Sequence, residues 1–81
     1  MTKTVAVIQR PPRLLDRAAT IADVAAEVAD VANRGASLAV FPEAHVPGYP
    51  EWIWRLRPGD PDDYHLSHLL YGRLVEQAVG L

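Results

Sequence analysis

Two apolar runs with one amphipathic segment between them constrain the fold of this chain most strongly. The runs, Thr4–Gln9 and Ser37–Phe41, are almost continuously apolar, and the first is rich in β-branched residues. Such runs are typical of strands buried on both faces, in a sheet that helices cover. The segment between them, Asp16–Arg34, has the periodicity of a helix. A strand, a helix and a strand in this order predict a βαβ unit with two parallel strands, and hence a layered α/β domain.

The segment Asp16–Arg34 predicts a helix with one apolar stripe and clear signals at both ends. Asp16 is a suitable N-cap, with Thr20 as the alternative, and Gly35 stands where a C′ glycine would end the helix. We expect the small, alanine-rich stripe to lie close on the sheet, with polar residues on the opposite side. The stripe consists of Ile21, Val24, Ala25, Val28, Val31 and Ala32, and the polar side of Thr20, Asp23, Glu27, Asp30 and Arg34.

A second helix is predicted after an irregular, proline-rich loop over Pro42–Gly59. Asp60 offers an N-cap, Pro61 favours the first helical position, and two further aspartates face the positive end of the helix dipole. The helical pattern runs to about Val79, and Gly72 could interrupt it, because glycine costs about 1 kcal/mol relative to alanine. The apolar stripe of this helix consists of Leu66, Leu69, Leu70, Leu74 and Ala78.

Composition and charge exclude several classes of protein. The formal net charge of -2 comes with scattered basic residues, which argues against nucleic acid and against an acidic membrane surface as partners. The absence of cysteine excludes a disulfide framework, a thiolate metal site and a cysteine nucleophile within the chain. No apolar run approaches the roughly 20 residues that span a bilayer, and no signal-peptide pattern precedes the first strand. We therefore expect a soluble, cytoplasmic protein.

The predicted elements do not make a complete sheet. Two parallel strands cannot cover their own edges, and one helix layer leaves one face open. With 81 residues the chain allows one small domain at most. We therefore expect residues 1–81 to be a fragment of something larger.

Glu43 is the first candidate for chemistry. It follows Pro42 at the end of the second apolar run, and open α/β sheets build their sites at the carboxyl ends of strands. Apolar neighbours such as Phe41 disfavour the charged form of a carboxylate and suit a general base. The alternative is a structural role, in which the carboxylate accepts N–H bonds from the loop.

The residues after Glu43 supply weaker candidates. Tyr49 and Trp52 could line a substrate pocket, and Trp54 could do so with less support. The alternative is that these rings pack the loop onto the sheet or meet another subunit. His45 could hydrogen-bond near Glu43, although a loop histidine that faces solvent is the simpler interpretation.

No metal site is predicted. His65 and His68 lie near Asp62 and Asp63 at the start of the second helix. One helix rarely closes a coordination sphere, and acidic residues in this place are typical of a solvated, dipole-matched helix start.

The motifs from Val5 to Arg57 resemble the nitrilase superfamily of carbon-nitrogen hydrolases. V-F-P-E-A followed by P-G-Y-P-x-W-x-W is similar to the first signature block of its nitrilase branch. V-A-V-I-Q, L-L-D-R-x-x-T-I and R-G-A-x-L-x-V-F-P-E match in the same order. F-P-E alone is shared with the superfamily's amidases, and the aromatic continuation is more specific to nitrilases.

The resemblance implies a fold, a reaction and a role for Glu43. The fold is an αββα sandwich that assembles into homo-oligomers, and no cofactor is implied. The family uses a Glu-Lys-Cys triad, in which Glu43 would take the proton of the cysteine thiol. The thiolate attacks the nitrile carbon, and the covalent thioimidate is hydrolysed to a carboxylic acid and ammonia. The substrate would be a small-molecule nitrile, or an amide if the protein is an amidase.

The departures from the family pattern limit what this chain can do by itself. The chain has no cysteine, and its only lysine, Lys3, precedes the first strand and does not match the family's lysine. The resemblance therefore implies that residues 1–81 are the N-terminal, incomplete part of a single carbon-nitrogen hydrolase domain. We expect these 81 residues alone to be inactive and the longer parent to be the enzyme. The alternatives are an amidase of the same superfamily and a non-catalytic α/β interaction module in which Glu43 is structural.

Overall fold

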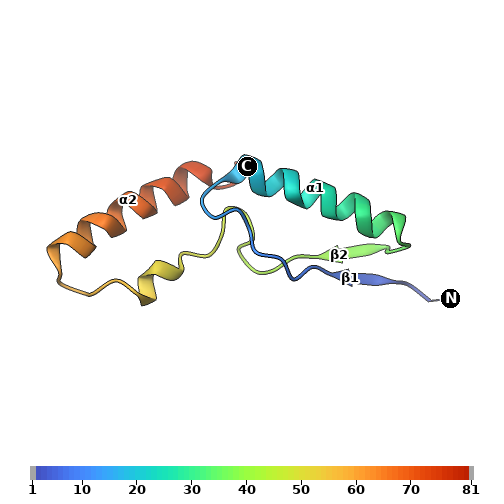
Figure 1. Cartoon of the computed structure of the whole chain (residues 1–81), viewed down its shortest axis with the longest axis horizontal. Helices are drawn as coiled ribbons and strands as arrows, with labels where there is room; N and C mark the ends of the chain where they lie inside the picture. Colours follow the sequence, from blue (N-terminus) through green and yellow to red (C-terminus); the bar gives the residue numbers. More distant parts are fainter. Residues whose placement is uncertain (1, 81) are drawn as a thin grey trace.

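A computed structural model describes residues 2–80 of the chain. In chain order it contains strand β1 (Val5–Val7), helix α1 (Arg17–Asn33), strand β2 (Leu38–Val40), the 3-10 helix η1 (Glu51–Trp54) and helix α2 (Pro61–Gln77) (Figure 1). The two strands are parallel, and Val5 pairs with Leu38 and Val7 with Val40. The predicted βαβ unit and its α/β class are therefore confirmed, and both strands are shorter than their apolar runs.

Both long helices begin as the sequence predicts. The Asp16 side chain accepts a hydrogen bond from the Ala19 N–H at 3.0 Å and caps α1. The Asp60 side chain accepts from the N–H groups of Asp62 and Asp63, both at 3.0 Å, and caps α2. These caps satisfy N–H groups that have no partner inside a helix.

The predicted helix ends are also largely confirmed. Gly35 follows α1 with φ of 92°, and its N–H donates to the Ala32 carbonyl at 3.0 Å. This is the left-handed conformation that a C′ glycine adopts without strain. Helix α2 continues through Gly72 without a break and ends at Gln77, slightly before the predicted Val79.

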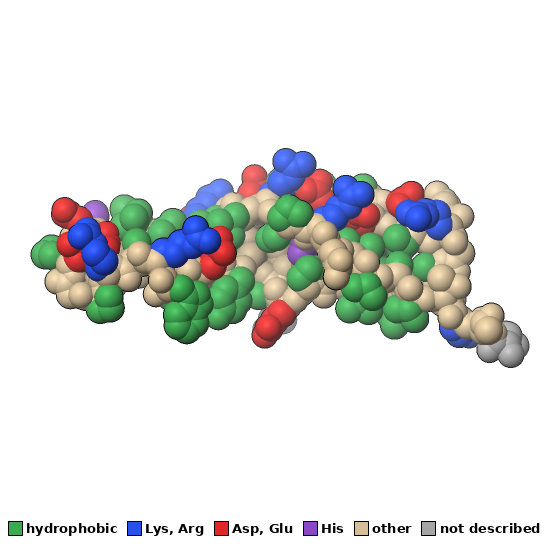
Figure 2. Space-filling model, turned by 60° about the horizontal axis from the view of Figure 1, so that its bottom comes forward, with side chains coloured by type: hydrophobic (Ala, Val, Ile, Leu, Met, Phe, Trp, Pro, Cys, Tyr) green, Lys and Arg blue, Asp and Glu red, His purple; other side chains and the backbone are tan. Residues whose placement is uncertain are grey.

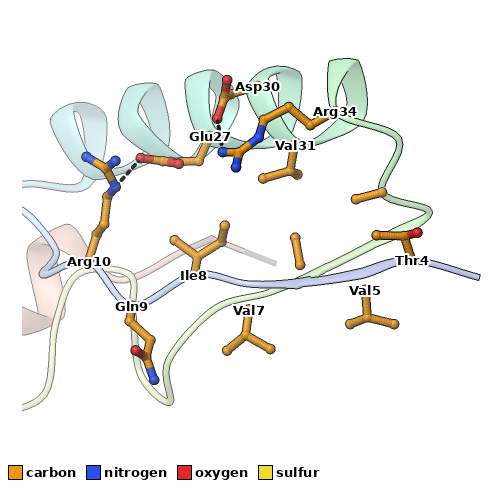
Figure 3. A pocket seen from close by; sticks show the side chains of 12 residues that line it. Thr4, Val5, Val7, Ile8, Gln9, Arg10, Glu27, Asp30, Val31 and Arg34 are labelled. Carbon is orange, nitrogen blue, oxygen red and sulfur yellow. Dashed lines mark hydrogen bonds and ion pairs between the residues drawn. The ribbon is translucent and has the colours of Figure 1, made fainter.

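The face of α1 that covers the strands includes only part of the predicted apolar stripe, because Val31 of the stripe is buried together with Thr20 of the predicted polar side. Thr20 and Val31 are its buried residues, whereas Ile21 and Val28 are 47% and 44% exposed. The Arg10 side chain reaches across from the end of β1 and pairs with Glu27 at 2.8 Å (Figure 3). The helix therefore presents both polar and apolar side chains to the strands. Most residues of the predicted stripe are exposed in the structure of residues 2–80.

The prediction that the strands are buried on both faces is wrong for the described residues. Ile8 points toward α1 and is buried, whereas Val5 and Val7 point away from the helix (Figure 3) and are 53% and 66% exposed. The open face of β2 is apolar as well, because Leu38 and Val40 are exposed. Figure 2, turned so that the strands come forward, shows hydrophobic side chains gathered on this face. One helix covers one face of the sheet, and nothing in residues 2–80 covers the other.

Helix α2 extends away from the βαβ unit and gives the molecule an elongated shape (Figure 1). The principal extents are 57 × 21 × 19 Å, and the radius of gyration is 16.3 Å. A compact domain of this length would have a radius of gyration of roughly 12 Å. The last turn of α2 returns to the start of α1, and this junction is the main contact between the two helices (Figure 1).

Candidate functional site

Glu43 lies in a turn that directly follows β2. The Ile8 N–H donates to the Val40 carbonyl at 2.8 Å, so the parallel pairing continues to the carboxyl ends of both strands. The turn Glu43–Pro47 begins there, and its Ala44 has a positive φ of 52°. The topology thus places the Glu43 carboxylate at the edge where parallel α/β sheets carry their sites, as predicted.

The Glu43 side chain is exposed and is not used as a structural acceptor. The carboxylates that accept backbone N–H bonds in residues 2–80 belong to Asp16, Asp60 and Asp63, and Glu43 is not among them. The expected apolar surroundings of this carboxylate are likewise not formed by the described residues. The carboxylate is therefore accessible from outside the described part of the chain.

The far end of the Glu43 turn is fixed against the loop that precedes α1. Pro47 and Gly48 are buried, and the Pro47 carbonyl accepts a hydrogen bond from the Leu15 N–H at 2.9 Å. Gly48 has φ of 122°, and a Cβ added there would lie 2.6 Å from Cδ1 of Leu14. Only glycine combines this backbone conformation with such a close approach. The P-G pair in the sequence indicates a turn, but it does not reveal these partners in another loop.

His45 packs inside the turn, so the expectation that it faces solvent is wrong. Its ring centroid lies 5.3 Å from that of Phe41, and the residue is half-buried. Its Nδ1 is buried and has no hydrogen-bond partner among residues 2–80. Phe41 and His45 thus flank the backbone that carries Glu43. Both rings line a hollow of about 410 Å³ that Arg13 and Asp23 also border.

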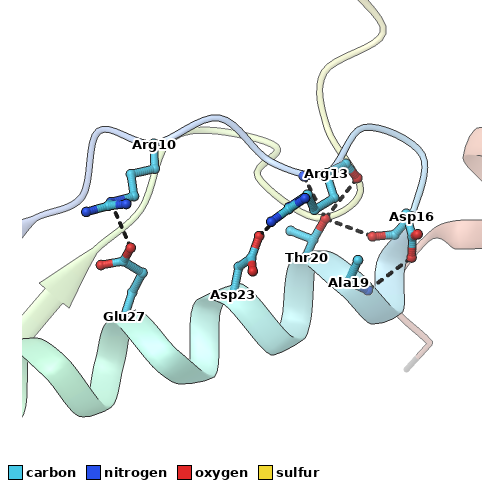
Figure 4. Close-up of polar contacts among 7 residues, drawn as sticks. All are labelled: Arg10, Arg13, Asp16, Ala19, Thr20, Asp23 and Glu27. Atoms are coloured by element: carbon cyan, nitrogen blue, oxygen red, sulfur yellow. Dashed lines mark hydrogen bonds and ion pairs between the residues drawn. The ribbon is translucent and has the colours of Figure 1, made fainter.

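Polar contacts hold the loop before α1 onto the helix (Figure 4). Thr20 has no exposed surface, and its hydroxyl accepts from the Arg13 N–H at 3.1 Å. The Arg13 guanidinium pairs with Asp23 at 2.7 Å. The hydrogen bond to Asp23 and the charge of Asp23 raise the pKa of Arg13. This loop is therefore fixed on α1, and the Glu43 turn is bonded to it through Leu15 and Pro47.

The aromatic candidates divide into one buried ring and two exposed ones. Trp52, in η1, is 7% exposed, and its Nε1 is buried without a hydrogen-bond partner in residues 2–80. Tyr49 is 46% exposed and Trp54 is 77% exposed. The hollow beside His45 is lined by neither Tyr49 nor Trp52. The structure therefore does not place these two residues with Glu43 around one cavity.

The histidines of α2 lie apart from the Glu43 turn. The His68 ring packs edge-on against Tyr64 at 4.5 Å between ring centroids. No group of three or more His, Asp or Glu side chains in residues 2–80 is arranged to hold a metal ion. Asp63 instead pairs with Arg57 at 2.9 Å, and this hydrogen bond lowers the pKa of the Asp63 carboxyl.

The sequence model of one protein family matches nearly all of the chain. Residues 4–76 match the family described as carbon-nitrogen hydrolase, which includes both strands, α1 and the Glu43 turn. The chain belongs to the carbon-nitrogen hydrolase family.

Curated relatives of this carbon-nitrogen hydrolase chain are named nitrilases. It is 47% identical over 75 residues to an arylacetonitrilase of Aspergillus oryzae, a match that covers 93% of the chain and 20% of the relative. It is 50% identical over 50 residues to a nitrilase of Bacillus sp. strain OxB-1, covering 62% of the chain and 15% of the relative. The chain thus spans a fifth or less of the length of these two relatives. No solved structure matches it.

The family match supports the resemblance found in the sequence motifs. The N-terminal position of the hydrolase motifs and the nitrilase relatives agree with the nitrilase interpretation.

Within residues 2–80, none of the helices has the length and apolar character needed to cross a membrane.

Proposed function

We propose that the whole protein is a nitrilase that hydrolyses an organic nitrile to a carboxylic acid and ammonia, with Glu43 as a general base. The observation that carries this proposal is the 47% identity to an arylacetonitrilase over 75 residues, a span that includes the Glu43 turn. The location of Glu43 after a parallel strand supports it further, because catalytic groups gather at this edge of α/β sheets.

The proposed reaction assigns one proton transfer to Glu43. Its carboxylate takes the proton of a cysteine thiol, and the thiolate sulfur forms a bond to the nitrile carbon while the nitrile nitrogen gains a proton. The resulting thioimidate is hydrolysed by two waters in all, which releases ammonia and the carboxylic acid and restores the thiol. The cysteine and the lysine of the triad lie outside these 81 residues, which contain no cysteine.

Three features of the structure suit Glu43 to this role. Its side chain is exposed, so it can meet a thiol contributed by another part of the protein. It is not used to accept backbone N–H bonds, in contrast to the capping carboxylates. The turn that carries it is fixed at Pro47 by the Leu15 N–H, which limits the motion of its far end. A general base needs such placement, since proton transfer requires hydrogen-bond contact with the donor.

Two further properties belong to this proposal. We infer that β1 and β2 lie inside an αββα sandwich, whose other elements cover the exposed face of Val5 and Val7. We also infer that the whole protein forms homo-oligomers. Tyr49 and Trp52 stay candidates for substrate contact, with Tyr49 the more accessible of the two.

The experiment compares two glutamate substitutions in the whole protein. Glu43→Gln keeps the size of the side chain and removes the base, and Glu51→Gln removes an exposed carboxylate that pairs with Arg55 at 3.7 Å. Ammonia release is measured with phenylacetonitrile, an aliphatic nitrile and phenylacetamide. We expect Glu43→Gln to lower kcat by about 100-fold or more, as the loss of a general base does, and Glu51→Gln to leave it unchanged.

The outcomes separate the competing functions. Release of ammonia from a nitrile but not from phenylacetamide supports the nitrilase, whereas the reverse identifies an amidase with the same role for Glu43. An active Glu43→Gln variant would contradict the base assignment. A whole protein that hydrolyses neither substrate would instead favour an interaction module.

A further inference from the structure

Leu15 connects the Glu43 turn to the second helix through its own backbone. Its φ is 57°, a left-handed conformation that is uncommon for leucine. Its N–H donates to the Pro47 carbonyl at 2.9 Å, and its carbonyl accepts from Nε of Arg73 at 3.0 Å. One peptide segment before α1 therefore contacts both the turn after β2 and the helix α2.

Other bonds at the same junction hold the end of α2 against the start of α1. The Arg17 N–H donates to the side-chain oxygen of Gln77 at 2.9 Å, and the Arg17 guanidinium donates to the Ala78 carbonyl at 2.7 Å. These bonds use a free N–H at the start of α1 and a free carbonyl at the end of α2, the groups that helices leave unpaired. The last turn of α2 is thus fixed to the first turn of α1 (Figure 1), and Arg73 lies one turn before it.

The other side of the connection is equally well defined. Pro47 and Gly48 are buried, and a Cβ added at Gly48 would lie 2.6 Å from Cδ1 of Leu14, so the Leu14 side chain would have to shift. The Glu43 turn thus has one end in the strand pairing of β2 and the other against Leu14 and Leu15. Leu15 is therefore bonded to the last residue of the turn that begins at Glu43.

We propose that Arg73 is a positioning residue for Glu43, which acts through Leu15 and Pro47 and does not touch the substrate. The proposal rests on the proposed function, in which Glu43 is the general base. The bond from Arg73 is charge-assisted, and such bonds are shorter and stronger than neutral ones. It holds the Leu15 peptide in its left-handed conformation, with the N–H directed at Pro47.

Positioning acts on the chemical step more than on binding. A general base works only within hydrogen-bond reach of its proton donor, and a misplacement of about 1 Å can lower the rate about 100-fold. Arg73 belongs to α2. It lines neither the hollow beside His45 nor a second hollow between β1 and α1. Its loss should therefore lower kcat and leave KM for the nitrile nearly unchanged.

The test uses three variants of the whole protein with phenylacetonitrile as the substrate. Arg73→Met keeps the aliphatic stem and removes the donor, and Arg73→Lys keeps a cationic donor. Arg34→Met is the matched control, because each arginine pairs with a carboxylate of its own helix, Arg73 with Glu76 at 3.7 Å and Arg34 with Asp30 at 3.4 Å. Arg34 is not bonded to Leu15. We expect Arg73→Met to lower kcat roughly tenfold at unchanged KM, Arg73→Lys to recover most of it, and Arg34→Met to match the wild type.

A second readout makes the outcome independent of folding. Hydrogen exchange of the Leu15 amide should become faster in Arg73→Met and stay slow in Arg34→Met, in protein that remains folded. An unchanged kcat in Arg73→Met, or a loss that Arg73→Lys does not recover, would overturn the proposal. If Glu43→Gln is fully active, the proposed function itself has failed. If Glu43→Gln is inactive and Arg73→Met is normal, only the positioning role has failed.

Discussion

The hydroxyl of Thr20 is bonded to both backbone groups of Arg13. It accepts from the Arg13 N–H at 3.1 Å and lies 2.9 Å from the Arg13 carbonyl, while the Asp16 carbonyl is 2.8 Å away. The side chain has no exposed surface. Thr20, in the first turn of α1, thus fixes the loop to which the Glu43 turn is bonded. It does so with a polar group on the helix face that covers the strands.

We predict that Thr20→Val destabilises the protein more than Thr20→Ser. Valine keeps the shape but leaves the partly buried Arg13 N–H without its partner, and an unpaired polar group away from water costs about 1–3 kcal/mol. Serine keeps the hydroxyl and loses one methyl group, which costs about 1 kcal/mol. Denaturant unfolding of the whole protein measures both. A serine variant that is less stable than the valine variant would show that packing, and not the hydrogen bonds, fixes this loop.

The helix α1 shows how far the sequence pattern could go. Its ends were predictable because Asp16 and Gly35 act through local backbone geometry. Its covered face was not, because apolar periodicity finds a stripe but does not tell which partner the stripe meets. Ile21 and Val28 belong to that stripe and are exposed in residues 2–80, whereas the polar Thr20 is buried. A side chain that bonds to a distant loop leaves no periodic signal.

We predict that Gly48→Ala weakens the attachment of the Glu43 turn. The new Cβ would lie 2.6 Å from Cδ1 of Leu14, and alanine is strained at φ of 122°. Thermal unfolding should therefore occur at a lower temperature than in the wild type. The double variant Gly48→Ala, Leu14→Ala removes the clash but not the backbone strain, so its loss relative to Leu14→Ala alone should be smaller. Equal losses in both backgrounds would mean that only the backbone conformation matters.

We predict an acid-sensitive contribution to stability from Asp63. Its hydrogen bonds from the Arg57 guanidinium and backbone N–H hold the pKa of the Asp63 carboxyl below the ordinary value of 3.8. A lowered folded-state pKa contributes stability that is complete above pH 3.8 and is lost as the pH falls from there toward the folded-state value. Asp63→Asn should therefore lose stability at pH 7 and show a flatter dependence below pH 4.

The control for the acid effect keeps the Asp63 carboxylate and removes its partner, the Arg57 guanidinium. Arg57→Met takes away the guanidinium that bonds to Asp63 at 2.9 Å, so it should flatten the same acidic limb. Thermal melts between pH 2.5 and 7 at low salt measure the effect, since salt screens exposed pairs. A full acidic limb in Asp63→Asn would assign it to other carboxylates.

The site was predictable as a location and not as an environment. Glu43 follows a strand and a proline, and these local signals placed it correctly at the carboxyl end of β2. The packing of His45 on Phe41 depends on the shapes of the two side chains. The bond from Leu15 to Pro47 joins residues that are far apart in the sequence. No spacing in the sequence encodes either contact. Residues 2–80 leave the Glu43 side chain exposed.

We predict that the 81-residue chain by itself hydrolyses no nitrile. The proposed reaction needs a thiolate, and the chain contains no cysteine. Ammonia release from phenylacetonitrile should stay at the rate of the buffer alone, with the whole protein as the positive control. Turnover by the isolated chain that Glu43→Gln abolishes would contradict the cysteine mechanism.

We also predict that the isolated chain unfolds without a sharp transition. Its accessible surface is 6305 Å², whereas a compact protein of its mass would expose roughly 4,800 Å². Much of the excess is apolar, because Val5, Val7, Leu38 and Val40 on the open face of the strands are all exposed. Cooperative unfolding depends on a shared buried core, and residues 2–80 bury few large side chains. Circular dichroism should therefore show a broad thermal transition, and a sharp one would support a self-sufficient interaction module.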